Sequence, residues 1–334
     1  MKYNYYVGCD VSKNELDFAV YKKDAFVFHR EIENNGKSID AFFKELKQLP
    51  DYKASSTDIC MEHTGIYNNP LLEYLHKKKA NICLESAMQI KNSQGNLRGK
   101  NDKIDAIRIA EYAYTFRDKI KLWQPKREVI QQLARFSSDR TRLLTAQKML
   151  QTPLNESKIF ASSKLHKVSN ECFANTLKSI KKDLEKIDIA INEVIKSDEE
   201  LSRLFGIITS VAGIGTVTAI GIIVTTNEFK DINDSKKYAC YAGVAPFVRE
   251  SGIFRGKGRV STLANKAMKS LLHMASLSAI KCNESIKAYY ERKVAEGKNK
   301  MSVLNAVRNK LIHCIFTCVN QNRKYEKTYT SSLV

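Results

Sequence analysis

The sequence has no pair of cysteines spaced as C-x-x-C, although it contains eight cysteines in 334 residues. Most of them lie inside apolar runs such as Asp58–Met61 and Ile82–Leu84. This usage is typical of reduced, buried thiols in the cytosol rather than of a disulfide framework. His313, Cys314 and Cys318 lie within helical reach of one another, but the further ligands of a zinc site are absent, so core packing is the favoured interpretation. The cysteines are Cys9, Cys60, Cys83, Cys172, Cys240, Cys282, Cys314 and Cys318.

Long apolar runs that would act as a signal peptide or a membrane anchor are also scarce. Met1–Val7 has no run long enough for a signal peptide. The segment Leu204–Asn227 contains no charge over 24 residues, which approaches the length of a membrane helix. It holds four glycines and six threonines or serines, and the basic chain offers no second span. We therefore expect two short buried helices around Gly213-Ile214-Gly215, in a cytoplasmic protein without membrane attachment.

Acidic residues are too few to balance the basic ones, and the formal net charge is +19. A field of this sign favours polyanions, because Lys and Arg that neutralise phosphates release condensed counterions. A merely soluble basic protein, or one that binds anionic membranes, would have the same charge. The hydrophobic fraction of 43% predicts a globular chain, and its length suggests about two domains.

The first 115 or so residues alternate between strands and helices. The pattern predicts an α/β domain over residues 1–118, with a mixed sheet whose first three strands form an antiparallel meander. The expected strands are Tyr5–Cys9, Leu16–Tyr21, Ala25–Ile32, Asp58–Met61 and Asn81–Leu84. The expected helices are Ser38–Leu49, Pro70–Lys78 and Asp102–Tyr114.

Glycine and strand signals are both missing from residues 128–197, so we expect a helical or coiled-coil segment over residues 119–200. Its apolar stripe either packs on its own domain or makes an oligomer contact. Residues 201–320 predict a mainly helical domain, with helices at Leu263–Ile280, Ser285–Ala295 and Met301–Cys318, and residues 321–334 a polar tail. The stripe consists of Phe173, Leu177, Ile180, Leu184, Ile187, Ile191 and Val194.

Four acids stand where a metal-dependent nuclease would need them. Asp10 and Glu62 each follow an apolar strand, while Asp102 and Asp105 share one helix face because they are three residues apart. Side chains at strand ends and on a neighbouring helix can meet at one edge of a sheet. Four carboxylates there would hold two Mg²⁺ ions about 3.5–4 Å apart, since hard divalent cations prefer carboxylate oxygen.

Each acid also has a structural interpretation. Asp10 could begin a turn, Glu62 could pair with a lysine, and Asp102 could cap the helix that has Asp105 in its first turn. The basic residues around the last two acids are candidates for contacts with a nucleic-acid backbone. These are Arg98, Lys100, Lys103 and Arg108.

The series D…E…D-x-x-D-A resembles the RuvC-like domain, of ribonuclease H-like fold, in DEDD transposases of insertion sequences (the IS-one-ten and IS-eleven-eleven groups). The last third resembles the same family. Val211–Ala219 is similar to its helix-hairpin-helix-type stretch, Tyr238–Pro246 to its A-x-Y-x-G-L-x-P motif, and Glu250-Ser251-Gly252 to its S-G motif. The two sets of motifs occur in the family's order, and the resemblance covers nearly the whole chain.

The resemblance implies that Ser251 is a nucleophile, which would conserve bond energy in a phosphoserine. From the sequence alone, Ser251 is equally well a hairpin-turn residue. Basic residues around it would stabilise the charge on a pentacovalent phosphate, and would bind nucleic acid. These are Arg249, Arg255, Lys257, Arg259, Lys266 and Lys269.

Two departures from the family pattern stand out. Asn101 replaces the Thr or Ser that often precedes the third acid, and Ala264–Lys269 replaces a G-N-x-x-L-R pattern, with loss of its glycine and arginine. Neither departure alters the acids or the serine.

The resemblance further implies a recombinase that excises and inserts its element, acts on donor and target DNA, uses an element-encoded guide RNA and assembles as a dimer or tetramer. Two alternatives remain open. A plain RuvC-like nuclease would need the four acids and water only. A non-catalytic nucleic-acid-binding protein with a dimerising coil would need neither acids nor serine. An actin-like sugar kinase is disfavoured, because its glycine-rich phosphate loops are missing.

Overall fold

The computed structural model describes residues 3–93, 101–251 and 254–326. The chain divides into two compact units, Met1–Pro125 and Lys126–Val334. The four segments given above, residues 1–118, 119–200, 201–320 and 321–334, stay a prediction.

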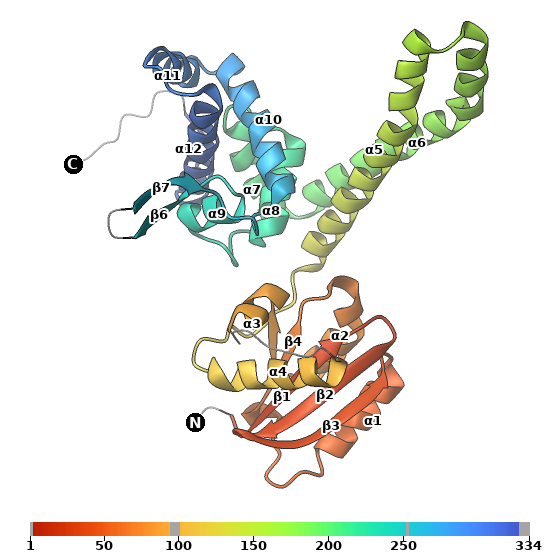
Figure 1. The fold of residues 1–334 in the computed structure, drawn as a ribbon, viewed down its shortest axis with the longest axis vertical. Coiled ribbons are helices and arrows are strands. Elements are labelled where there is room, and N and C mark those ends of the chain that lie inside the picture. Colours follow the sequence, from red (N-terminus) through yellow and green to blue (C-terminus); the bar gives the residue numbers. More distant parts are fainter. Residues whose placement is uncertain (1–2, 94–100, 252–253, 327–334) are drawn as a thin grey trace. The chain divides into compact units, whose positions relative to one another are not determined.

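A mixed sheet organises the first unit (Figure 1). Its described strands lie in the order β3-β2-β1-β4-β5. The first three form the expected antiparallel meander, and β4 and β5 run parallel to β1. This mixed five-stranded sheet fits a ribonuclease H-like fold. The strands are β1 (Tyr5–Val11), β2 (Glu15–Lys22), β3 (Ala25–Glu33), β4 (Thr57–Glu62) and β5 (Asn81–Glu85).

Helices cover both faces of this sheet, because alternate strand residues on each side are apolar. On one face, α1 (Gly36–Leu46) and α2 (Asn69–Lys77) complete a core in which Phe18 stacks on Phe42 at 4.0 Å. On the other face, α3 (Ala87–Ser93) and α4 (Asp102–Thr115) pack over Tyr6, Cys60 and Cys83. Short 3-10 turns, η1 (Ala54–Ser56) and η2 (Gly65–Asn68), flank β4.

The second unit begins with a helical hairpin, α5 (Glu128–Phe160) and α6 (Ser163–Ser197). Ile191 and Val194, at one end of the predicted stripe, are buried in the core of this unit, and Ile187 packs against that core. Phe173, at the other end, stays 37% exposed. The stripe therefore packs on its own unit at one end, and an oligomer contact along the rest stays a prediction.

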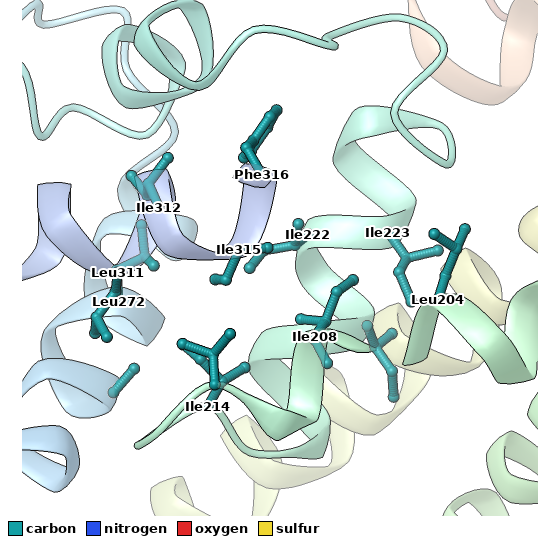
Figure 2. Packing of buried hydrophobic residues seen from close by; sticks show 14 of the residues in the cluster. Leu204, Ile208, Ile214, Ile222, Ile223, Leu272, Leu311, Ile312, Ile315 and Phe316 are labelled. Carbon is teal, nitrogen blue, oxygen red and sulfur yellow. The ribbon is translucent and has the colours of Figure 1, made fainter. Parts of the chain in front are cut away.

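Two helices cover the uncharged segment, as expected: α7 (Glu199–Ser210), which begins before the segment, and α8 (Thr216–Thr226). Gly213 turns between them with φ 84°, and a Cβ there would lie 2.5 Å from the carbonyl oxygen of Ala275. Ile208, Ile222 and Ile315 meet in the shared core (Figure 2). Among the described residues, no helix is both long and apolar enough to span a bilayer.

The rest of the second unit mixes helices with one hairpin of strands. The helices are α9 (Ser235–Tyr241), α10 (Lys266–Cys282), α11 (Glu284–Ala295) and α12 (Lys300–Asn320). The antiparallel strands β6 (Phe247–Ser251) and β7 (Phe254–Arg259) were not expected from the sequence. Their glycines and basic residues break the alternation of apolar and polar residues that marks a strand.

Candidate active site

Strand register brings the first two acids together. In the parallel pair β1–β4, Gly8 lies opposite Cys60 and Cys9 opposite Met61, so the next positions, Asp10 and Glu62, are neighbours. Both acids lie at the carboxyl ends of their strands, which meet at one edge of the sheet. Asp10 faces the same side as Gly8, because side chains two residues apart in a strand point the same way.

A close helix contact brings the other two acids to this edge. A Cβ on Gly8 would lie 2.2 Å from the carbonyl oxygen of Ala106 and 2.3 Å from the backbone nitrogen of Ala110. Only glycine therefore lets α4 lie directly against β1. The first turn of α4, which carries Asp102 and Asp105, then reaches the end of the strand that carries Asp10.

The α4 cap corrects one sequence interpretation. Asp102 is not the helix cap. The preceding Asn101 fills that position, and its side-chain oxygen accepts a hydrogen bond of 2.7 Å from the backbone nitrogen of Ile104. Asn, Ser and Thr all cap helices in this way, so the departure from the family pattern at this position preserves the cap. Asp102 is left available for other contacts.

The electrostatics of Asp10 reflect the four acids together. Burial first, and then the charges of Asp105, Glu62 and Asp102 in that order, raise the pKa of this carboxyl from 3.8 to about 6. The energy of such repulsion falls as the distance between two charges grows, which agrees with the strand register and the α4 contact described above. The structure therefore gathers all four acids around one edge of the sheet.

Ser251 lies in the second unit, at the end of β6, where it pairs with Phe254 across the hairpin. It is exposed. Ser251 is thus the last residue of strand β6, and its exposure leaves the hydroxyl accessible to a substrate.

The predicted nucleic-acid contacts fall on several elements. Arg249, Arg255 and Lys257 occupy positions in the β6–β7 hairpin, and Arg259 ends β7 with an exposed side chain. Lys266 and Lys269 lie in the first turns of α10, and Lys103 and Arg108 on α4. The basic residues around Ser251 are thus concentrated on the hairpin and on the start of the next helix. Arg98, Lys100 and Gly252 lie outside the described residues.

Two family models match the chain in this order. One, described as a transposase and built on DEDD proteins of the IS110 type, matches residues 7–155 and so contains all four acids. The other, described as the transposase IS116/IS110/IS902 family, matches residues 206–291 and contains Ser251. The chain is a DEDD transposase of the IS110 type. It is therefore a DNA-recombining enzyme of an insertion sequence family.

Curated relatives of this transposase agree with the assignment. The pilin gene-inverting protein of Moraxella bovis is 24% identical over 333 residues, which cover 96% of this chain and 98% of that protein. The same protein of Moraxella lacunata matches to the same extent. An uncharacterized 43.6 kDa protein of the insertion element IS110 from Streptomyces coelicolor is 23% identical over 153 residues, 46% of this chain and 37% of its own length.

The transposase family implies dependence on a divalent metal, and the donor set suits one. All four acids offer hard carboxylate oxygens. Asp105 forms an ion pair with Arg108, with 2.8 Å between Oδ1 and Nη1. Among the described residues, no three His, Cys, Asp or Glu side chains stand close enough together to hold an ion as they are. An ion held by these carboxylates would therefore need them to turn toward one another, and would compete with Arg108 for Asp105.

Two further acids share this face and were not predicted from the sequence. Asp17 lies opposite Asp10 in the β1–β2 register, is buried, and has Oδ1 2.8 Å from Nε2 of His29. Glu85 lies opposite Glu62 in the β4–β5 register, and burial raises its pKa. Strand pairing reveals this row. In the sequence, the only signal is that Asp10 and Asp17 are placed symmetrically about a tight turn.

Proposed function

We propose that this transposase cuts and rejoins DNA at a site formed by Asp10, Glu62, Asp102 and Asp105, with Ser251 as the nucleophile. The observation that carries the acidic site is the β1–β4 register, in which Asp10 and Glu62 are neighbours, and the close contact of α4 with Gly8 supports the addition of Asp102 and Asp105. Carboxylates that repel one another gain most from divalent cations. Mg²⁺, about two ions by analogy with other phosphoryl-transfer sites, would stabilise charge on the attacked phosphate.

The proposed step for Ser251 is a transesterification. Its Oγ forms a bond to phosphorus while the bond from phosphorus to one DNA oxygen breaks. The serine hydroxyl gives up a proton, and the departing DNA oxygen takes one up. Because the phosphoserine ester retains the bond energy, a DNA hydroxyl can attack it in turn and release the serine without ATP. The exposure of Ser251 beside basic hairpin positions supports this role.

The proposed partners are donor and target DNA, an element-encoded guide RNA, and further copies of the chain. The net charge of +19 supports the binding of nucleic acids. Large apolar side chains on the α5–α6 hairpin support assembly, since Ile159 and Phe160 are 73% and 86% exposed.

The test uses labelled donor DNA, guide RNA and Mg²⁺, with purified wild type, Ser251→Ala and Asp10→Asn. We expect covalent protein–DNA adducts and recombinant junctions from wild type alone. Ser179→Ala, an exposed serine on α6, is the matched control and should behave as wild type. Strand cleavage by Ser251→Ala, without adducts or junctions, would favour the alternative, a RuvC-like metal-dependent nuclease that uses water.

DNA inversion is a second candidate outcome of the same chemistry. It is favoured by the similarity to two pilin gene-inverting proteins, which extends over 96% of this chain. The similarity to the insertion element IS110 protein extends over 46% of it. Inversion and excision are distinguished with two plasmids, one carrying two recombination sites in inverted orientation and one carrying them in direct orientation. Inversion gives a flipped segment, whereas excision from direct sites gives a circle.

A further inference from the structure

Arg308 on α12 is a buried cation with no acidic partner among the described residues. It is 5% exposed. Its Nη2 lies 2.6 Å from Nδ1 of His273 on α10, and its Nη1 lies 3.4 Å from Oδ1 of Asn305. Its Nε has no hydrogen-bond partner among the described residues. Both partners are therefore neutral groups.

This arrangement is costly for a fold that needs only packing. Burying a charge without an opposite charge costs free energy that an apolar side chain would not. The guanidinium group has donors only, so Nδ1 of His273 must accept and the ring proton must sit on Nε2. Consistently, burial and the charge of Arg308 lower the pKa of His273. The imidazole thus stays neutral and holds Arg308 in place.

Asn305 links this cation to the backbone before the β6–β7 hairpin. Its Oδ1 accepts from Arg308, so its Nδ2 is directed to the carbonyl oxygen of Val244, at 2.6 Å. Val244 follows Gly243, which turns the chain with φ 63°, and stands three residues before β6. The chain of hydrogen bonds therefore runs from α10 through α12 to the entry of the hairpin that carries Ser251.

The segment that follows the hairpin is hydrogen-bonded to the segment that precedes it. Asn265, which caps α10 after β7, donates from its backbone nitrogen to the carbonyl oxygen of Tyr241 at 2.8 Å. Its Nδ2 donates to the Tyr241 hydroxyl, also at 2.8 Å. A Cβ on Gly243 would lie 2.7 Å from Cβ of Ala264. The segments before β6 and after β7 therefore pack closely against each other at the turn of Gly243.

We propose that Arg308 is a positioning residue that fixes, with His273 and Asn305, the base of the hairpin carrying Ser251. Its effect on strand cleavage rests on the function proposed above, whereas its effect on the hairpin does not. An attacking hydroxyl must stay in line with the phosphate, and a misplacement of about 1 Å can cost about 100-fold in rate. A mobile hairpin base would therefore slow the reaction without removing any DNA contact.

The experiment compares full-length wild type with Arg308→Met, Arg308→Lys and Asn305→Ala. Arg292→Met, an exposed arginine on α11, is the matched control. Three quantities are measured: the Kd for donor DNA at several salt concentrations, the rate of adduct formation at saturating DNA, and amide hydrogen exchange in β6 and β7. For Arg308→Met we expect an adduct rate at least about 10-fold lower, a Kd within about 3-fold of wild type, and exchange in β6 and β7 faster by about 10-fold. Arg308→Lys should recover part of the rate.

Several results would overturn this role. One is wild-type exchange and rate in folded Arg308→Met. Another is a weaker Kd with a shallower salt dependence, which would make Arg308 a direct phosphate contact. If Arg308→Met does not fold, Asn305→Ala decides, because it keeps the cation and its bond to His273 and removes the link from Arg308 through Asn305 to Val244. Wild-type exchange in that variant contradicts the proposal. Adducts from Ser251→Ala would refute only the assignment of Ser251 as nucleophile. Amide hydrogen exchange in β6 and β7 tests the positioning role of Arg308 separately.

Discussion

Asp10→Asn should stabilise the metal-free protein while abolishing its activity. The pKa of Asp10, raised from 3.8 to about 6, means that the folded protein holds an ionised carboxylate there at a cost. The difference corresponds to at most about 3 kcal/mol above pH 6. Because the carboxyl is partly open to solvent, which screens charge, we expect about 1.5 kcal/mol. An amide at this position carries no charge and avoids the cost.

The pH dependence of stability gives the sign of the effect. The folded state keeps its proton up to about pH 6, whereas the unfolded state loses it near 3.8. Between these values the folded state binds more protons, so this group makes the wild type less stable as pH rises, and the full penalty applies above pH 6. Asp10→Asn should lack this decline.

The assay is thermal unfolding in EDTA at pH 7.5, repeated at pH 4.5 and with excess Mg²⁺. At pH 7.5 we expect a midpoint about 5 °C higher for the variant, and a smaller difference at pH 4.5. Mg²⁺ should raise the midpoint of wild type but not that of Asp10→Asn. Asp24→Asn, in the exposed turn between β2 and β3, is the control and should change nothing. A variant no more stable than wild type in EDTA would contradict the cost assigned to the ionised Asp10 carboxylate.

Three further changes test the scaffold. Gly8→Ala should cost about 3 kcal/mol and all activity, because the new Cβ meets the α4 backbone; thermal melting and cleavage assays would check it. Asn101→Ala should cost about 1 kcal/mol by removing the α4 cap, whereas Asn101→Ser should match wild type in the same melts. Arg127→Met should cost about 2 kcal/mol in chemical denaturation. It leaves the buried Glu228 with Lys230 alone, and an unchanged midpoint would contradict this role.

The sequence was sufficient to predict the strands of the first unit and the ends at which Asp10 and Glu62 stand. Apolar runs that stop at an acid are a local signal, and so is the spacing of Asp102 and Asp105 on one helix. The two helices within Leu204–Asn227 were also predictable, because glycines interrupt the run in the middle.

Other features depend on contacts that no local pattern records. Gly8 is an ordinary strand residue until α4 lies on it, and Asp17 joins the acidic row only through strand register. Arg308 looks like a surface residue of an amphipathic helix, and only packing of α10 against α12 buries it. The helices α3 and α9 have seven residues each, too few for a periodic signal.

The proposed reaction joins Ser251 to DNA under the control of the acidic site. Its most direct test is to trap the reaction on donor DNA in Mg²⁺, digest the protein and identify the DNA-bearing peptide by mass spectrometry. We expect a phosphodiester on Ser251 in the wild type and none when Asp10 is replaced by Asn. A DNA adduct on another residue, or full strand exchange without any protein adduct, would contradict it.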